Sequence, residues 1–166
     1  MTMEAKRNLL THRLLLAVLL LLGTFMTACD EDDINLDDLL NNDVAYEGVQ
    51  LKGAHEVPAV PSDGIGLINV YYNSNTRIIT YDLVWTLGKP DDETVGMHFH
   101  GPATPNMNAG VVIPVTGFSN TSKGSLTGST RALTKEEERQ LLNGLWYFNI
   151  HSKTYPAGEL RGNIIH

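Results

Sequence analysis

Short runs of alternating apolar and polar residues, separated by turn-forming residues, constrain the fold of this chain most. In the clearest run (77–87), every second side chain belongs to one apolar face, formed by Ile79, Tyr81, Leu83 and Trp85. Alternation with a period of two is typical of a strand with one buried face. Other β-type runs cover 49–54, 67–72, 111–115, 124–132 and 159–165, with Gly, Pro, Asn and Ser between them. Two further strands contain histidines, so we expect about eight strands.

A single helix interrupts this pattern. Thr134 and Glu137 have the spacing of a capping box, and the helix is expected to end at Asn143-Gly144, where glycine suits the position after the last turn. The sequence therefore predicts an all-β fold, an antiparallel Greek-key β-sandwich or flattened barrel of about eight strands with one short helix.

Two histidines, His98 and His100, lie two residues apart in the strand-like run TVGMHFH. On a strand this spacing puts both imidazoles on the same face. Val95, Met97 and Phe99 alternate with them and are expected to face the core. The histidines would then look outward or into a cleft.

A third histidine, His151, lies on the polar face of the run WYFNIHS. Imidazole is a good ligand for copper and zinc, so His98, His100 and His151 are candidate metal ligands. An alternative is that they only donate hydrogen bonds to loop carbonyls. His55 is a fourth candidate ligand, although nothing in the sequence places it beside the other three.

Three charged residues are further candidates for a cleft. Glu159 and Arg161 lie two residues apart, so they share one strand face. We expect them to bridge to a neighbouring strand or to fix the His151 loop, in preference to a catalytic role. Glu56 follows His55 and could ligate a metal, but a loop carboxylate that accepts from backbone donors is the favoured interpretation.

The first 28 residues have the features of an export signal. Lys6, Arg7 and Arg13 precede the apolar run 14–22, which is shorter than the roughly 20 residues that a membrane span needs. The segment Met-Thr-Ala before Cys29 resembles the lipobox of bacterial lipoproteins. This resemblance implies cleavage before Cys29, lipidation of that residue and a membrane anchor. We therefore divide the chain into a signal peptide (1–28), an acidic tether (29–44) and one domain (45–166).

The exported part of the chain is strongly acidic. The whole chain holds 12 Lys and Arg against 19 Asp and Glu; the first 28 residues contain three and one of these, which leaves a net charge of −9 for the rest. This charge argues against a nucleic-acid partner, which requires a basic surface. The acidic residues after Cys29 suit a solvated tether and also resemble surface-export signals of bacterial lipoproteins. The expected location is the bacterial cell envelope, at the outer membrane or cell surface.

Several separated segments, LKGAHEVPAV, MHFHGPA, YFNIHS and PAGELRGNI, occur in the order expected of the CHRD domain, the module named after chordin. The resemblance covers about residues 49–165. It implies a β-sandwich of extracellular or cell-surface proteins and brings no settled biochemical activity. His55 departs from the family pattern, in which glutamine is more usual.

A more distant likeness is to copper/zinc superoxide dismutase, in which an HxH strand and a later histidine bind copper. The zinc-binding loop and the cysteine pair of that enzyme have no counterpart here. The chain also lacks a nucleophile elbow, a P-loop and a dinucleotide fingerprint. We therefore favour a binding module, with a surface protein as partner and with copper or zinc bound by histidines. A redox metalloenzyme and a purely structural surface protein remain open alternatives.

Overall fold

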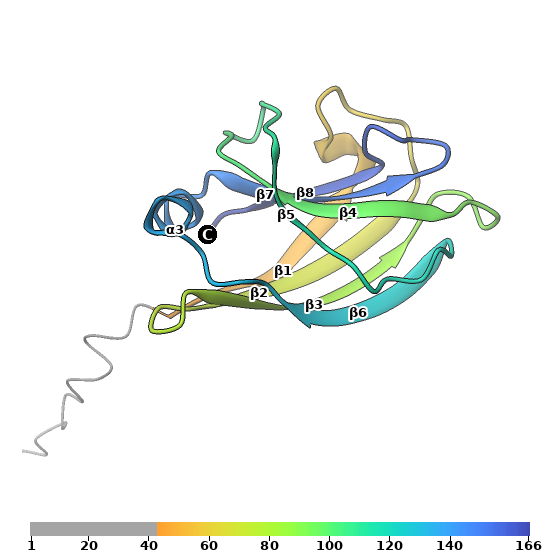
Figure 1. Cartoon of the computed structure of the whole chain (residues 1–166). Coiled ribbons are helices and arrows are strands. Elements are labelled where there is room, and N and C mark those ends of the chain that lie inside the picture. The colour runs from red at the N-terminus through yellow and green to blue at the C-terminus, as the bar shows by residue number, and fades with distance from the viewer. Residues whose placement is uncertain (1–42) are drawn as a thin grey trace, which may run out of the picture. The chain divides into compact units, whose positions relative to one another are not determined.

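A computed structural model describes residues 43–166 of the chain. The expected signal peptide, the lipidation site Cys29 and nearly all of the acidic tether lie outside the described residues. The described part consists of eight antiparallel strands in one strongly curled sheet, a half-barrel, with one short α-helix and one 3-10 turn (Figure 1). The elements are β1 (Val44–Lys52), η1 (Gly53–His55), β2 (Ile65–Asn73), β3 (Ile78–Thr86), β4 (Thr94–His100), β5 (Val111–Pro114), β6 (Lys123–Ser129), α3 (Lys135–Leu142), β7 (Trp146–Ser152) and β8 (Leu160–Ile164).

The all-β prediction, with eight strands and one helix, is confirmed. The strand order is β5-β4-β7-β8-β1-β2-β3-β6, so the halves β5-β4-β7-β8 and β1-β2-β3-β6 belong to one continuous sheet. Three of the neighbouring pairs, β4 with β7, β8 with β1 and β3 with β6, join strands that are distant in the sequence. No helix in the described part of the chain is long and apolar enough to cross a membrane.

The core lies between the two halves of the curled sheet. The apolar face predicted for 77–87 is confirmed, because Ile79, Tyr81, Leu83 and Trp85 are at most 5% exposed. The ring of Tyr81 meets the edge of Phe99 at a centroid distance of 5.6 Å, which connects β3 to β4 across the core. Burial of these large side chains is the main contribution that holds the halves together.

One expected core residue, Val95, faces solvent with 48% of its surface exposed. The cause is an irregularity in the pairing of β4 with β7 between Thr94 and Gly96, which changes the face that the neighbouring side chains occupy. Thr94 is buried instead, and its hydroxyl accepts a hydrogen bond of 2.9 Å from Trp85 Nε1. Met97 and Phe99, beyond the irregularity, are fully buried as expected.

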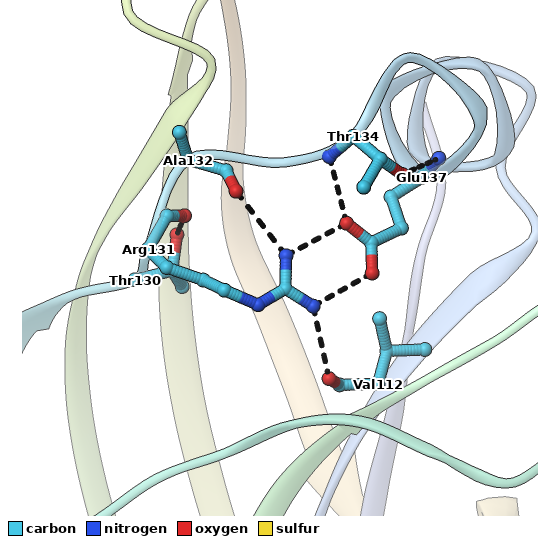
Figure 2. A network of polar contacts seen from close by, with 6 residues as sticks. All are labelled: Val112, Thr130, Arg131, Ala132, Thr134 and Glu137. Carbon is cyan, nitrogen blue, oxygen red and sulfur yellow. Dashed lines mark hydrogen bonds and ion pairs between the residues drawn. The ribbon is translucent and has the colours of Figure 1, made fainter.

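The helix α3 begins with the predicted capping box. Thr134 Oγ1 accepts from the Glu137 backbone amide at 3.2 Å, and Glu137 Oε2 accepts from the Thr134 amide at 2.8 Å. The same carboxylate binds the Arg131 guanidinium through two hydrogen bonds of 2.7 Å (Figure 2). Arg131 also donates to the carbonyl of Val112 at 3.4 Å, so this network connects the start of the helix with the edge strand β5. The helix is followed by Gly144 in a left-handed conformation (φ +68), as predicted.

Candidate metal centre

The histidines meet on the face of the sheet that points away from the core. In the register of β4 and β7, His98 is opposite Asn149 and Gly96 is opposite His151. Side chains two residues apart share a face, so His98, His100 and His151 lie on the same side. One ligating nitrogen from each of these three residues lies within 4.8 Å of the others. The sequence-predicted set of three is therefore brought together.

Gly96 provides room for this cluster. It belongs to the same face of β4, two residues before His98, and a side chain there would begin 3.2 Å from His98 Cε1 and 3.4 Å from His151 Cδ2. The first distance is tighter than ordinary van der Waals contact, and the second lies at its lower limit. A glycine at this point lets two imidazoles lie side by side over the backbone.

His100 has one ring nitrogen engaged and one without a partner. Its Nδ1 lies 3.0 Å from the carbonyl oxygen of Ala109. A carbonyl can only accept, so Nδ1 carries the proton and Nε2 carries a lone pair. His100 is 7% exposed, and its Nε2 has no hydrogen-bond partner among the described residues. A buried lone pair without a donor is unusual, which makes this nitrogen a candidate ligand position.

His151 is oriented in the same way. Its Nδ1 donates to the carbonyl of Pro156 at 3.0 Å, which leaves a lone pair on Nε2. The distance between His151 Nε2 and His98 Nδ1 is 3.1 Å, so the latter nitrogen donates to the former in the protein alone. His100 and His151 thus bond loop carbonyls through Nδ1, as one of the two sequence-based interpretations expects, while the three histidines also form a cluster that could hold a metal.

The electrostatics favour neutral imidazoles. Burial lowers the pKa of His98, His100 and His151 below the ordinary value of 6.5. The neighbouring imidazoles lower the pKa of His98 and His100 further, because a second positive charge would be repelled. Neutral imidazole is the form that binds a metal ion.

A stack of rings and charge supports His100 from one side. Tyr147 lies parallel to the His100 ring, with 2° between the planes and 4.7 Å between the centroids. On the Tyr147 ring lies the Arg161 guanidinium, whose carbon is 3.6 Å from the ring centroid. Tyr147 and Asn149 share the face of His151 in the alternation of β7, yet they are only 3% exposed because loops cover this face.

Arg161 holds the covering loop that follows β4. It is fully buried and donates to the carbonyls of Pro105 and Met107 at 3.2 and 2.9 Å and to Asn108 Oδ1 at 3.0 Å. The same loop provides the Ala109 carbonyl that orients His100. Arg161 therefore fixes the loop after His100, whereas the sequence-based expectation was a contact with the His151 loop. In Figure 1 the loops after β1 and β4 stand above β7 and β8.

Glu56 and Asn149 form a second buried polar contact on this face. Both side chains lie against Gly158, whose missing Cβ would come within 2.9 Å of Asn149 Nδ2 and closer still to Glu56 Oε1. Burial raises the pKa of Glu56 to about 7, although the charge of Arg161 and the amide of Asn149 lower it. Asn149 also acts on His100, whose pKa it raises. Asn149 therefore lies between Glu56 and the histidines.

The raised pKa of Glu56 predicts a pH-dependent stability. Its folded-state pKa of about 7 exceeds the ordinary 4.5. The neutral Glu56 carboxyl therefore makes its full contribution to the free energy of unfolding below pH 4.5, and this contribution is lost as the pH rises through 7. Between pH 5 and pH 8, the free energy of unfolding measured in urea should fall by about 2 kcal/mol more for the parent than for Glu56→Gln. The histidines titrate in both proteins, so the difference isolates Glu56. Parallel pH profiles would show that the Glu56 carboxyl does not titrate in this range.

The remaining predicted residues lie outside the cluster. His55 is exposed, and its Nδ1 contacts the Arg161 carbonyl oxygen at 3.1 Å, so the structure does not bring it to the other histidines. Glu159 is buried and accepts from Ser62 Oγ at 2.6 Å and the Gly88 amide at 2.7 Å. Within the described residues it forms no ion pair with Arg161. Glu159 thus holds two turns against β8.

Residues 48–164 match the CHRD domain family. The chain belongs to this family. No curated protein and no solved structure gives a significant match. The matched range begins within β1 and ends at the last residue of β8, so this CHRD domain includes all eight strands and the three-histidine cluster.

Proposed function

We propose that this CHRD domain binds one transition-metal ion, copper or zinc, through His98, His100 and His151. The buried lone pair of His100 Nε2 carries the proposal, because it has no donor to satisfy it among the described residues. Two nitrogens bound to one tetrahedral zinc at about 2.0–2.1 Å lie roughly 3.3 Å apart. His98 Nδ1 and His151 Nε2 are 3.1 Å apart, so they need little movement.

The carbonyl bonds of the cluster suit this role. Metal-binding histidines commonly donate their second nitrogen to a carbonyl or carboxylate, which fixes the tautomer and the ring orientation. His100 and His151 already do so through Ala109 and Pro156. His98 would transfer its proton from Nδ1 to Nε2, so that all three ligands stay neutral.

We further propose that the domain acts as a lipid-anchored binding module on the extracytoplasmic side of a bacterial envelope. The export signal, Cys29 and the acidic tether support this location through the sequence pattern alone. A surface protein is the proposed partner. Radiolabelled palmitate incorporated by the parent and not by Cys29→Ala would support the anchor, and equal labelling of both would contradict it.

A copper redox enzyme is the second candidate function. Catalytic metal sites commonly have three protein ligands and an open position, whereas structural zinc sites have four. The three-nitrogen cluster fits the former pattern. Turnover of superoxide by the copper-loaded protein, lost in His100→Ala, would distinguish an enzyme from a binding module.

The first test of the metal site is a titration of metal-free protein with Cu(II) and Zn(II). We expect one ion per chain, and an affinity that falls by more than about a hundredfold in His100→Ala. At a free metal concentration of one hundred times Kd, the ion should stabilise the folded parent by about 2.7 kcal/mol. This gain is measured as a rise in Tm.

His55→Ala is the matched control, because it removes an exposed imidazole outside the cluster. It should bind metal like the parent. Equal binding by the parent and His100→Ala would overturn the proposed site, and loss of binding in His55→Ala would assign it to other ligands.

A further inference from the structure

We infer that the three-histidine site selects monovalent copper over divalent ions. This inference rests on the proposed metal site and adds the charge of its ligand. It follows from the uncompensated charge of a divalent ion bound by these residues, on a face where the nearest stacked charge is itself positive.

The ligand set provides no negative charge. The cluster consists of three imidazoles, and no Asp or Glu belongs to it among the described residues. The groups that orient the rings, the carbonyls of Ala109 and Pro156, are neutral as well. A bound Cu(II) or Zn(II) would therefore keep both of its positive charges, whereas Cu(I) would keep one.

Burial makes this difference important. His100 is 7% exposed, and the adjacent Tyr147 and Asn149 are 3% exposed. The free energy needed to move an ion into a poorly solvated site grows with the square of its charge, so a divalent ion is penalised roughly four times as much as a monovalent one. Carboxylate or thiolate ligands would offset part of this penalty, and the cluster contains neither among the described residues.

Arg161 increases the preference. Its fully buried guanidinium donates to carbonyl and amide oxygens and, among the described residues, to no carboxylate. The guanidinium lies on one side of the Tyr147 ring, and His100 is stacked on the same ring. Its positive charge repels Cu(II) more than Cu(I). At this separation, and at the effective dielectric constant of a protein, one unit of charge corresponds to about a fivefold to tenfold change in relative affinity.

Glu56 and Glu159 are buried carboxylates, and neither cancels this charge at the cluster. Glu56 is the carboxylate that acts on Arg161, and burial raises its pKa to about 7, so it is only partly ionised at neutral pH. Glu159 is directed to Ser62 and the Gly88 amide. Neither carboxylate is among the groups that shift the pKa of the three histidines.

The test measures the affinity of the full protein for Cu(I), Cu(II) and Zn(II) by competition with chromophoric chelators, under anaerobic conditions for Cu(I). We expect Cu(I) to bind more tightly than Cu(II) and Zn(II). Tighter binding of Cu(II) than Cu(I), lost in His100→Ala, would overturn the inference and leave the proposed metal site intact. Failure of all three ions to bind would overturn both.

Two charge variants test the cause. Asn149→Asp keeps the shape of the side chain but adds a negative charge beside His100, and it should lower the Cu(I)-to-Cu(II) affinity ratio by about tenfold. Arg161→Gln removes the positive charge and should lower the same ratio about fivefold, whereas Arg161→Lys should preserve it. An unchanged ratio in Asn149→Asp would overturn the electrostatic argument, and this variant leaves the loop contacts of Arg161 in place if Arg161→Gln does not fold.

Discussion

Replacement of Gly158 by alanine should lower the free energy of unfolding by about 3 kcal/mol. Gly158 has φ +136, a conformation that residues with a Cβ rarely adopt, and such strain costs about 1–3 kcal/mol. The new methyl group would also meet the Glu56 carboxyl and Asn149 Nδ2. Both partners are buried, so displacing them loses about 1–3 kcal/mol of polar contact.

Gly48→Ala is the matched control. Gly48 also has a positive φ (+68), but a Cβ there would meet nothing within 4 Å. The free energy of unfolding of Gly48→Ala should fall only by the cost of the backbone conformation, about 1–2 kcal/mol. Urea unfolding of both variants at one pH provides the comparison. Equal losses would show that the contact with Glu56 and Asn149 contributes nothing.

Gly158→Ala should also weaken metal binding, since Gly158 belongs to the turn that orients His151. Its amide donates to the Tyr155 carbonyl at 3.1 Å, and the neighbouring Pro156 carbonyl accepts a hydrogen bond from His151 Nδ1. Gly48 lies in β1 and has no contact with this turn. If both variants bound metal with the affinity of the parent, the turn at Gly158 would not contribute to the metal site.

The sequence predicts local features of this fold well, because they depend on neighbouring residues. Alternation places Tyr81 and Trp85 in the core, and the capping box places the start of α3 at Thr134. The shared face of His98 and His100 follows from the two-residue period of a strand. These features need no knowledge of which strands pair.

The parts that the sequence does not predict depend on pairing and coverage. His151 joins His98 only because β4 pairs with β7, and these strands are far apart in the chain. Tyr147 has an outward position on β7, yet loops cover it. Val95 fits the apolar alternation, but the irregularity at the start of β4 turns it to solvent. Register and loop position are tertiary properties, so a local pattern cannot provide them.

The buried arginine was the least predictable element of the site. Its position two residues after Glu159 predicts a bridge to a neighbouring strand or a contact with the His151 loop, whereas Arg161 binds carbonyls of the loop after His100 and the Tyr147 ring. The only sequence signal for this role is that the loop after His100 has several backbone carbonyls, which need hydrogen-bond donors. This need for donors does not show which residue supplies them.

Phe99→Ala should separate the stability of the fold from the chemistry of the site. Phe99 is fully buried between His98 and His100, on the opposite face of β4, and its ring lies 4.9 Å from that of Phe148. Its truncation should lower the unfolding free energy by about 3–5 kcal/mol, because a cavity replaces the ring. Val95→Ala, on the same strand but 48% exposed, should lose less than about 0.5 kcal/mol.

Because the imidazoles are positioned by loop carbonyls and by β7, the folded fraction of Phe99→Ala should still bind one metal ion per chain. Metal content and urea unfolding of the same sample measure the two effects. His100→Ala should show the reverse, loss of the ion with a smaller loss of stability, since it removes a side chain from the opposite face. If Phe99→Ala remained folded but no longer bound metal, the site would depend on core packing and not only on its orienting carbonyls.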